Sequence, residues 1–314
     1  MKYRRLGKSG IKVSEISLGS WLTYGKSVDN DLAYQCVKTA IDNGINLIDT
    51  ADIYNYGQSE IVLGEILKNF KRSDIVLATK TFFPMSQNIN DRGLSRKHII
   101  ESCNKSLKRL QTDYIDLYQC HRFDYEIEIE ELISTMDDLV KMGKILYWGV
   151  SEWSALQICD TVHTAKYLNK TKPSSNQPVY NMLNRYIEDE IIPLCKRDGL
   201  GLIVFSPLAE GILTGKYNNG IPQDSRANKN NINMFIKNKL TEENINKVRK
   251  LTNIANELGV TMSQLALSWC LRKEEITSTI IGASNPNQIL ENIKAVDIEL
   301  DNSVLNTIED ILEE

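Results

Sequence analysis

Short runs of β-branched and apolar residues alternate with longer helix-period segments along almost all of the 314 residues. This alternation is typical of βαβ units on a parallel sheet. The eight runs are EISLGS (15–20), INLIDT (45–50), IVLATK (75–80), YIDLYQ (114–119), ILYWGV (145–150), SNQPVY (175–180), GLIVFS (201–206) and STIIGA (278–283). Amphipathic helix candidates between them include 29–43, 58–70, 95–110, 128–142, 154–168, 187–197 and 286–296. Eight strands that each lead into a helix predict an α/β fold of the TIM type, a (β/α)8 barrel.

Three segments stand outside this repeat. Residues 2–15 predict a small N-terminal β-hairpin that covers the bottom of the barrel, and residues 301–313 predict an extra C-terminal helix. Residues 209–240 form a long excursion rich in Gly, Asn and Lys. Loops longer than about 15 residues in a compact fold are more often functional than idle, so this one could fold over a bound cofactor. No Pro/Ser-rich linker divides the chain, and we predict one domain over residues 1–314.

The composition excludes several classes of protein. Hydrophobic residues make up 42% and charged residues 25% of the chain, close to the averages for globular domains. The net charge of −4 provides no general attraction to nucleic acid or anionic membranes. No apolar run approaches the roughly 18 residues of a membrane span, and the first residues lack an apolar signal segment. We therefore predict a cytoplasmic protein that neither inserts into membranes nor binds nucleic acid.

The cysteines and histidines argue against a metal site. The six cysteines show no C-x-x-C spacing, which disfavours a disulfide framework and a thiolate site. The three histidines lie far apart and offer no histidine pair at helical spacing. We predict no metal, and reduced cysteines that belong mainly to the core.

Polar side chains follow the predicted strands, at the end of a barrel where active sites lie. At or just after each strand stand Trp21, Asp49 with Tyr54, Lys80, His121, Ser151, Gln177, Ser206 and Ser284. The serines could merely cap the following helices. Lys80 and His121 do not have that explanation.

A lysine inside a barrel mouth is costly to desolvate unless a carboxylate pairs with it, and Asp49, one strand away, is the natural partner. This could be a structural ion pair alone. A phenol with an ordinary pKa near 10 can, however, donate a proton near neutrality when an ammonium and an imidazole stabilise its phenolate. Asp49, Tyr54, Lys80 and His121 would together offer a carbonyl group a general acid and polarising donors.

The loops after the last two strands could hold a phosphate, as in other barrels. FSPLAEGILTGKY brings small residues, backbone amides and Lys216, and Arg226 follows it. In GASNPNQILEN, Ser284, Asn285 and Pro286 open a helix whose first amides favour an anion. Ordinary helix capping with a solvated lysine and arginine would also account for these residues.

These motifs resemble those of a known family. GINLIDTADIYNYGQSE, IVLATK, YIDLYQCH, GKILYWGVS, FSPLAEGILTGKY and IIGASNPNQILENI resemble, in order and over nearly the whole chain, the motifs of the aldo-keto reductase superfamily. Within it, the chain is most similar to the branch of bacterial general-stress reductases and β-subunits of voltage-gated potassium channels. The resemblance implies a (β/α)8 barrel without metal or flavin, and hydride transfer from a nicotinamide to an aldehyde or ketone.

The resemblance also implies roles for individual residues. Tyr54 would be the general acid, Lys80 with Asp49 would lower its pKa, and His121 would orient the carbonyl. The implied cofactor is NADP, with expected contacts from Ser20, Trp21, Asp49, Ser151, Gln177, Phe205, Ser206, Pro207, Leu208, Ala209, Gly211, Lys216, Arg226, Gly282, Ser284, Gln288, Glu291 and Asn292.

Two positions depart from the family pattern. Glu152 stands where many members have Asn and the channel-subunit branch has Arg, which affects one expected cofactor contact. Gln288 stands where many members place an Arg on the 2′-phosphate, so Lys216 and Arg226 are left to supply the charge. NADP is still favoured over NAD.

We predict a small-molecule carbonyl substrate, and the sequence does not identify it. The residues expected to line its pocket are Trp21, Tyr24, Tyr54, Phe82, Phe83, His121, Arg122, Phe123 and Trp153. Two alternatives stay open: a cofactor-sensing subunit that docks on a membrane or partner protein, and a barrel that uses Lys80 as a Schiff-base lysine, as aldolases do. Reaction direction and assembly into a homo-oligomer are equally open.

Overall fold

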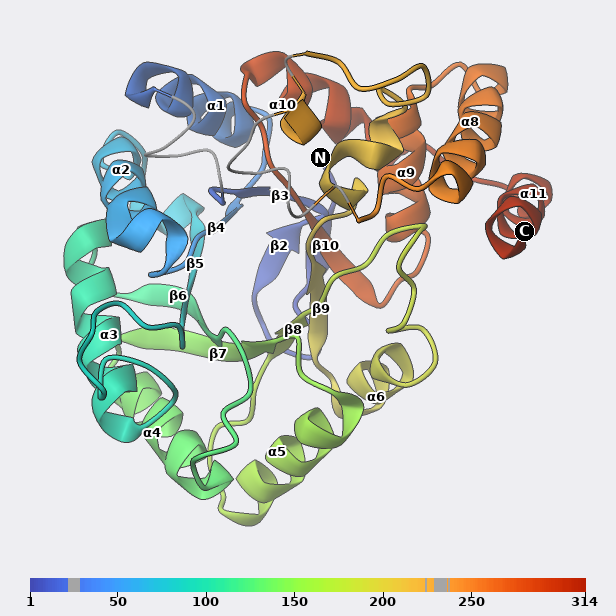
Figure 1. The fold of residues 1–314 in the computed structure, drawn as a ribbon. Helices are drawn as coiled ribbons and strands as arrows, with labels where there is room; N and C mark the ends of the chain where they lie inside the picture. Colours follow the sequence, from blue (N-terminus) through green and yellow to red (C-terminus); the bar gives the residue numbers. More distant parts are fainter. Residues whose placement is uncertain (22–28, 224, 229–235, 237) are drawn as a thin grey trace.

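Eight parallel strands close into a barrel surrounded by helices, which confirms the predicted fold (Figure 1). The computed structural model describes residues 1–21, 29–223, 225–228, 236 and 238–314, and for Arg226 it describes only the backbone. The strands follow one another in chain order, and the last one closes the barrel against the first. They are β3 (Ile16–Gly19), β4 (Leu47–Asp49), β5 (Val76–Thr81), β6 (Ile115–Cys120), β7 (Ile145–Ser151), β8 (Ser175–Gln177), β9 (Gly201–Val204) and β10 (Ile276–Ile281).

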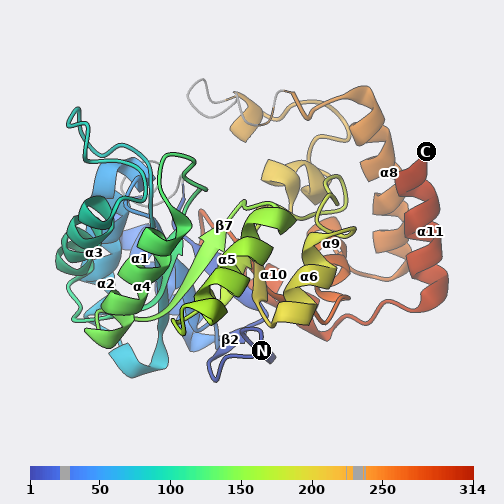
Figure 2. The same ribbon diagram turned by 90° about the horizontal axis from the view of Figure 1, so that it is seen from below.

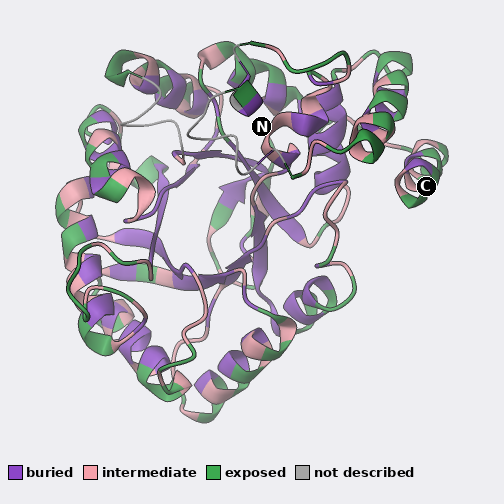
Figure 3. Ribbon diagram, in the orientation of Figure 1, coloured by how far each residue is buried: buried purple, intermediate pink, exposed green. Residues whose placement is uncertain are grey.

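Side chains that point into the barrel form an apolar floor. Leu47, Ala78, Leu117 and Ile203 are buried there, one from each of four strands. Side chains that point outward pack against helices, whose inner faces are buried and outer faces exposed (Figure 3). Because both faces of the strands are covered, the strands appear in the sequence as nearly continuous apolar runs.

The predicted N-terminal hairpin is present and covers the bottom of the barrel. β1 (Tyr3–Arg5) pairs with β2 (Lys12–Ser14) in antiparallel register. Leu6 and Val13 are fully buried against the floor, and burying each such side chain contributes about 1.5–3 kcal/mol. Figure 2 shows the hairpin at the end opposite to the long loops. The bottom is thus closed, and the carboxyl ends of the strands form the open end.

The predicted helices are present, with three corrections to their bounds. The helix expected at 58–70 ends at Leu67. The helix expected at 187–197 begins later, so that Pro193, which has no N–H, falls in the first turn where none is needed. The helix expected at 286–296 is α-helical only to Asn292 and continues as the 3₁₀ helix η5 (Ile293–Asp297). The observed helices are α1 (Asn30–Asp42), α2 (Gln58–Leu67), α3 (Arg96–Leu110), α4 (Ile129–Lys141), α5 (Ala155–Tyr167), α6 (Ile191–Asp198) and α10 (Pro286–Asn292).

Two further helices, which we did not predict, lie between β9 and β10. α8 (Glu242–Glu257) and α9 (Met262–Leu271) follow the long excursion, and every residue of α9 is buried. A sequence signal for α9 was present, because Thr261 and Gln264 form a capping box. The described residues of the excursion itself contain the short 3₁₀ helices η3 (Ala209–Thr214) and η4 (Arg226–Asn228).

The extra C-terminal helix is α11 (Asn302–Glu313), which confirms the prediction. It packs beside α8 at one side of the barrel (Figure 1). Ile308 and Ile311 are its buried residues. None of the helices in the described ranges is both long and apolar enough to cross a membrane.

Candidate active site

A layer of polar side chains lies directly above the apolar floor. Side chains in a strand return to the same face every second residue. The residues two positions after the floor residues of β4, β5 and β6 therefore also point into the barrel, and they are Asp49, Lys80 and Gln119. Gln177 at the end of β8 completes the layer, and all four residues are buried. The Gln177 amide donates to Asp49 Oδ1 over 2.9 Å. Gln119 was not predicted, although the same alternation along β6 indicates it.

Lys80 is at the centre of this layer. Its fully buried ammonium donates to Asp49 Oδ2 (2.6 Å), to the Thr50 carbonyl oxygen (2.9 Å) and to the Tyr54 hydroxyl oxygen (3.2 Å). The predicted pairing of Lys80 with Asp49 is therefore confirmed. Burial acts to lower the pKa of Lys80, but the attraction of Asp49 and Tyr54 outweighs it and the pKa is raised. The side chain is cationic at neutral pH, and its three donors are all used.

Tyr54 stands on a strained turn just after β4. The backbone N–H of Asp52 donates to the Lys80 carbonyl oxygen over 3.2 Å, which ties the turn to β5. After Tyr54, the residues Asn55 (φ 49°), Tyr56 (φ 51°) and Gly57 (φ 86°) all have left-handed backbone conformations. Asn and Gly adopt this conformation readily, whereas Tyr does so only at a cost of order 1–3 kcal/mol. The turn is thus held in a costly shape that presents the phenol to the barrel mouth.

Supporting hydrogen bonds hold this turn from below. Asp52, which is fully buried, accepts from the Ser102 hydroxyl over 2.9 Å. Glu60 at the start of α2 accepts from the Thr79 hydroxyl and from Arg109 Nε, each over 2.6 Å. These groups link the turn to β5 and α3, and the sequence analysis did not identify them.

Burial is the largest influence on the pKa values of the two rings, Tyr54 and His121. Burial raises the pKa of Tyr54, and the Lys80 ammonium offsets only part of that rise. The expected lowering of the Tyr54 pKa is therefore wrong for the protein without ligand. Burial, with Lys80 and Arg122, holds the pKa of His121 well below its usual range, so this imidazole is neutral and adds no charge. Its ring centroid lies 5.8 Å from that of Tyr54.

Aromatic side chains surround the mouth. Phe83 lies edge-on to His121 with 4.9 Å between centroids, and Phe82 contacts Phe83. Phe123 contacts Trp153, but Trp153 is only 1% exposed and belongs to the core. That Trp153 lines the pocket stays a prediction, and its edge-on contact with Phe123 places it beside one of the other expected pocket residues. Trp21 is partly buried just after β3, and Tyr24 lies outside the described residues.

The residues expected at a nicotinamide lie beside the polar layer. Ser151 at the end of β7 donates to the Gln177 carbonyl oxygen over 2.8 Å, and Ser20 donates to the Thr50 hydroxyl over 2.8 Å. Phe205, just after β9, packs against the apolar floor. The Glu152 carboxylate accepts a hydrogen bond from the Val179 backbone N–H over 2.7 Å, so it is engaged with the protein itself.

The segment after β9 has an unusual backbone. Ser206 (φ 52°), Ala209 (φ 45°), Glu210 (φ 56°) and Gly211 (φ 105°) all have left-handed conformations. A Cβ on Gly211 would lie 3.1 Å from Lys216 Nζ, so the bare glycine leaves its backbone approachable beside an ammonium. The backbone N–H groups of Ala209 and Gly211 donate to the Ser206 and Leu208 carbonyl oxygens, so the ammonium of Lys216 is the main group that this segment offers to a pyrophosphate. Pro207 and Leu208 belong to the same segment.

The residues after β10 that are expected to contact the cofactor differ in how far they are exposed. Gly282, Ser284 and Gln288 are exposed, and the Gln288 side-chain oxygen accepts from the Ser284 backbone N–H over 2.8 Å. Glu291 is also exposed, whereas Asn292 is buried, and their place beside an adenine stays a prediction. The side chain of Arg226 lies outside the described residues.

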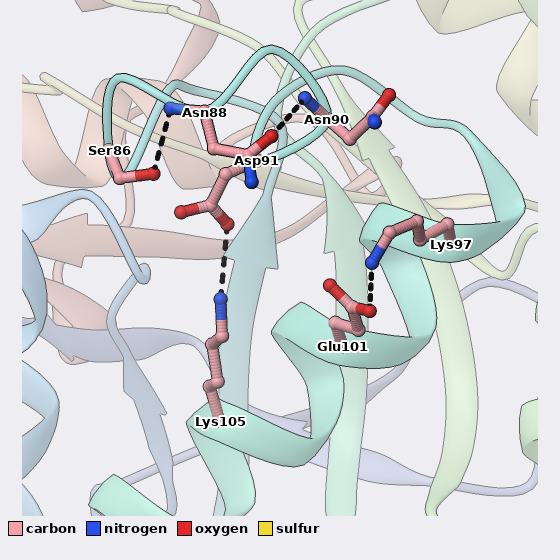
Figure 4. Close-up of a pocket in the computed structure, with 7 residues that line it drawn as sticks. All are labelled: Ser86, Asn88, Asn90, Asp91, Lys97, Glu101 and Lys105. Carbon is pink, nitrogen blue, oxygen red and sulfur yellow. Dashed lines mark hydrogen bonds and ion pairs between the residues drawn. The ribbon is translucent and has the colours of Figure 1, made fainter.

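The open polar hollow in Figure 4 is a different feature. It measures about 240 Å³ and is lined by Ser86, Asn88, Asn90, Asp91, Lys97, Glu101 and Lys105. Lys105 pairs with Asp91 over 3.1 Å, and Lys97 pairs with Glu101. The charges of the hollow neutralise one another, and none of the residues expected in the active site lines it.

One group of possible metal ligands lies on the outside of the barrel. Cys159 and His163, one turn apart on α5, and Asp198 at the end of α6 have ligand atoms within 4.8 Å of one another. The sequence analysis missed this group because it compared histidines only with each other. Arg197 donates to Asp198 Oδ2 over 2.8 Å and to Cys159 Sγ over 3.4 Å. This arginine bridges two of the three residues, and no metal is inferred.

Comparison with known proteins identifies the family. A model described as the aldo/keto reductase family matches residues 15–313. Two plant proteins, from Arabidopsis thaliana and Oryza sativa subsp. japonica, are named "Probable voltage-gated potassium channel subunit beta". The first is 43% identical over 100% of this chain and 97% of its own length, and the second is 42% identical over 95% and 92%. A "Putative voltage-gated potassium channel subunit beta" of Schizosaccharomyces pombe (strain 972 / ATCC 24843) is 44% identical over 99% and 93%. The chain belongs to the aldo/keto reductase family.

Proposed function

We propose that the protein reduces aldehydes or ketones to alcohols with NADPH, and that Tyr54 protonates the carbonyl oxygen. Membership of the aldo/keto reductase family supports an oxidoreductase. The observation that carries the proposal is the hydrogen bond that Lys80 donates to the Tyr54 hydroxyl oxygen, 3.2 Å long, at the open end of the barrel. Because the phenol oxygen accepts there, the phenol's own proton can point toward a ligand.

The side chains have complementary tasks in this proposal. Tyr54 stays protonated at neutral pH because its pKa is raised, yet a phenol is a stronger acid than an alcohol and can still give up its proton. Lys80 then stabilises the phenolate, and Asp49 keeps Lys80 in place. Neutral His121 donates a hydrogen bond to the carbonyl oxygen and orients it. Bound NADPH would supply the hydride to the carbonyl carbon.

The cofactor would lie across the strand ends. Ser151 and Gln177 would hold the carboxamide, since Gln177 belongs to the polar layer and accepts from Ser151. Phe205, which packs against the floor, would stack on the nicotinamide. The left-handed segment at 206–211 and Lys216 would hold the pyrophosphate. Ser284, Gln288 and Arg226 would surround the 2′-phosphate. We expect the protein to bind NADPH more tightly than NADH, and fluorescence titration with both cofactors tests this. Equal affinity for NADH and NADPH would overturn the preference for NADP.

Turnover by the purified protein tests the proposal directly. Consumption of NADPH is measured against a small set of aldehydes, dicarbonyls and ketones, with Tyr54→Phe as the matched variant. We expect turnover by the wild type and loss of turnover in the variant, which should still bind NADPH. A variant that loses NADPH binding would show that Tyr54 is misassigned.

The Schiff-base alternative receives no support from the geometry. A lysine that forms a Schiff base needs a neutral amine with a free lone pair. Lys80 is fully buried, uses its three donors and has a raised pKa. Borohydride with a carbonyl compound should therefore leave Lys80 unmodified.

A second candidate, a cofactor-sensing subunit of a channel, is favoured by the names of the three relatives. It predicts that the protein binds NADPH, turns over slowly or not at all, and is retained by a membrane protein. A pull-down from native membranes with and without NADPH distinguishes this candidate from the reductase. A cytoplasmic location and homo-oligomer formation stay predictions.

A further inference from the structure

We propose that the carbonyl substrate carries an anionic group, a carboxylate or a phosphate, and that Arg122 binds this group at the barrel mouth. The inference rests on the proposed reductase function and extends it to a class of substrate. Arg122 comes directly after His121, where β6 opens into the mouth. Its guanidinium lies 5.6 Å from the centroid of the Phe83 ring, which itself contacts His121. The charge therefore lies on the same side of the mouth as the imidazole.

The pairing of the arginines sets Arg122 apart. Among the side chains that the structure describes, every other half-buried arginine forms an ion pair with a carboxylate: Arg4 with Glu15, Arg72 with Asp116, Arg109 with Glu60, Arg185 with Glu188, and Arg272 with Glu188. No ion pair to Arg122 is formed in the same ranges. Its hydrogen bond goes to the neighbouring His121 carbonyl oxygen. Toward acceptors in the described ranges, Arg122 uses one of its five N–H donors.

Two carboxylates near Arg122 accept hydrogen bonds from other groups, and among the described residues neither forms an ion pair with it. Asp124, two residues further on, accepts from the backbone N–H groups of Leu94 (2.7 Å) and Glu126 (3.0 Å). Glu152, on the neighbouring strand end, accepts from the Val179 N–H (2.7 Å) and the Tyr186 hydroxyl (3.1 Å). Within the described part of the chain the guanidinium is partly desolvated and forms no ion pair, and a planar fork of this kind binds carboxylates and phosphates well.

The charge of Arg122 also reaches the reacting groups. It lowers the pKa of His121, as a smaller cause than burial and Lys80. It also acts to lower the pKa of Tyr54, where burial, Lys80 and Asp49 have larger effects. Because the imidazole and the guanidinium both lie near the Phe83 ring, a ligand that contacts both needs its carbonyl and its anion on one short chain. Short-chain aldehydes with a terminal carboxylate or phosphate meet this requirement.

Matched substrate pairs test the inference. Succinate semialdehyde is compared with butanal, and glycolaldehyde phosphate with glycolaldehyde, in the wild type, Arg122→Met and Arg122→Lys. For each pair, the kcat/KM of the anionic aldehyde is divided by that of the neutral aldehyde, and this ratio is compared between wild type and variant. The intrinsic reactivity of the two aldehydes then cancels. We expect Arg122→Met to reduce the anionic-to-neutral ratio by roughly 10- to 100-fold for at least one pair, as for loss of a charge-assisted hydrogen bond. The pair that responds tells carboxylate from phosphate.

Two controls separate recognition from other effects. Arg122→Lys should reduce the anionic-to-neutral ratio of kcat/KM less than Arg122→Met does. Arg92→Met, which removes an exposed arginine after β5, should leave this ratio unchanged. Equal loss for both members of each pair would mean a structural role for Arg122 and would overturn the inference. So would an unchanged ratio.

Failure of the reductase proposal is distinguishable from failure of this inference. If no carbonyl is turned over, binding of succinate semialdehyde and glycolaldehyde phosphate is measured by titration calorimetry, with and without NADPH. Binding that is weakened by Arg122→Met and by added salt would support the anion site without the reductase. Absence of such binding in the wild type would refute it.

Discussion

Lys80 and Asp49 form an ion pair inside the barrel, with 2.6 Å between Nζ and Oδ2 and side chains that are 0% and 4% exposed. Taking two charges out of water costs as much as their attraction returns, so the pair is not explained by stability. Its geometry offers a better reason, because the same ammonium donates to the Tyr54 phenol oxygen.

Removal of one partner should reveal the cost of this arrangement. In Lys80→Met the Asp49 carboxylate stays buried without its counter-ion, and we expect a loss of about 3–5 kcal/mol in the free energy of unfolding. Urea denaturation measures it. The double variant Lys80→Met/Asp49→Asn should recover much of that loss while staying inactive. Equal stability of the single and double variants would argue against a coupled pair.

The pH profile of carbonyl reduction follows from the two ring pKa values. Tyr54 must hold its proton, and its pKa is raised above the ordinary value of 10.0, so activity should persist until pH exceeds 10. His121 has a pKa well below 6.5 and should stay neutral on the acid side. We expect kcat/KM to be flat between these limits. A fall in activity around pH 8 would contradict the raised phenol pKa, provided that the protein is still folded there.

The barrel could be predicted because its architecture is repeated locally. Each buried parallel strand appears as a short β-branched run, and the order of strands around the barrel is the order in the chain. The strand expected at 175–180 was too long, because Pro178 has no N–H with which to continue the ladder after Gln177. α8 and α9 were missed because they interrupt the repeat between β9 and β10.

The active-site residues were predictable as far as they follow strand ends. Asp49 and Lys80 meet as expected, because adjacent parallel strands bring their carboxyl ends together. The pKa of Tyr54 was not predictable in the same way, since its direction depends on how burial compares with one nearby charge. The burial of Trp153 likewise depends on the loop around it rather than on its position after β7.

Asp52 gives the protein a pH-dependent stability. Burial, followed by repulsion from Glu60, raises its pKa from 3.8 to about 7, while the Ser102 hydroxyl and Arg109 act in the opposite direction. The folded state therefore binds the proton more tightly than the unfolded chain. The stabilisation is fully present below pH 3.8 and is lost as pH rises through about 7.

We expect the contribution of Asp52 to fall by up to about 4 kcal/mol across this range, since one pKa unit is worth about 1.4 kcal/mol. Urea denaturation at pH 5 and pH 8.5 should show about 2.7 kcal/mol of it, the part lost between pH 5 and about 7. Asp52→Asn should lose less stability between these two pH values than the wild type does. Asn in place of the exposed Asp113 is the control and should behave like the wild type. An Asp52→Asn variant with the wild-type pH dependence would show that Asp52 is ionised throughout.

Gly211 offers a test of the cofactor segment with a matched control. Alanine there meets two obstacles: a φ of 105° that costs of order 1–3 kcal/mol, and Lys216 Nζ only 3.1 Å from the new Cβ. Gly220 has a similar φ of 117° but open space around it. Gly211→Ala should weaken NADPH binding about tenfold or more in a fluorescence titration, because the methyl group displaces the ammonium and covers the backbone. Gly220→Ala should introduce similar backbone strain but leave NADPH affinity unchanged. Equal effects of the two substitutions would assign the loss to backbone strain and remove the segment from the cofactor site.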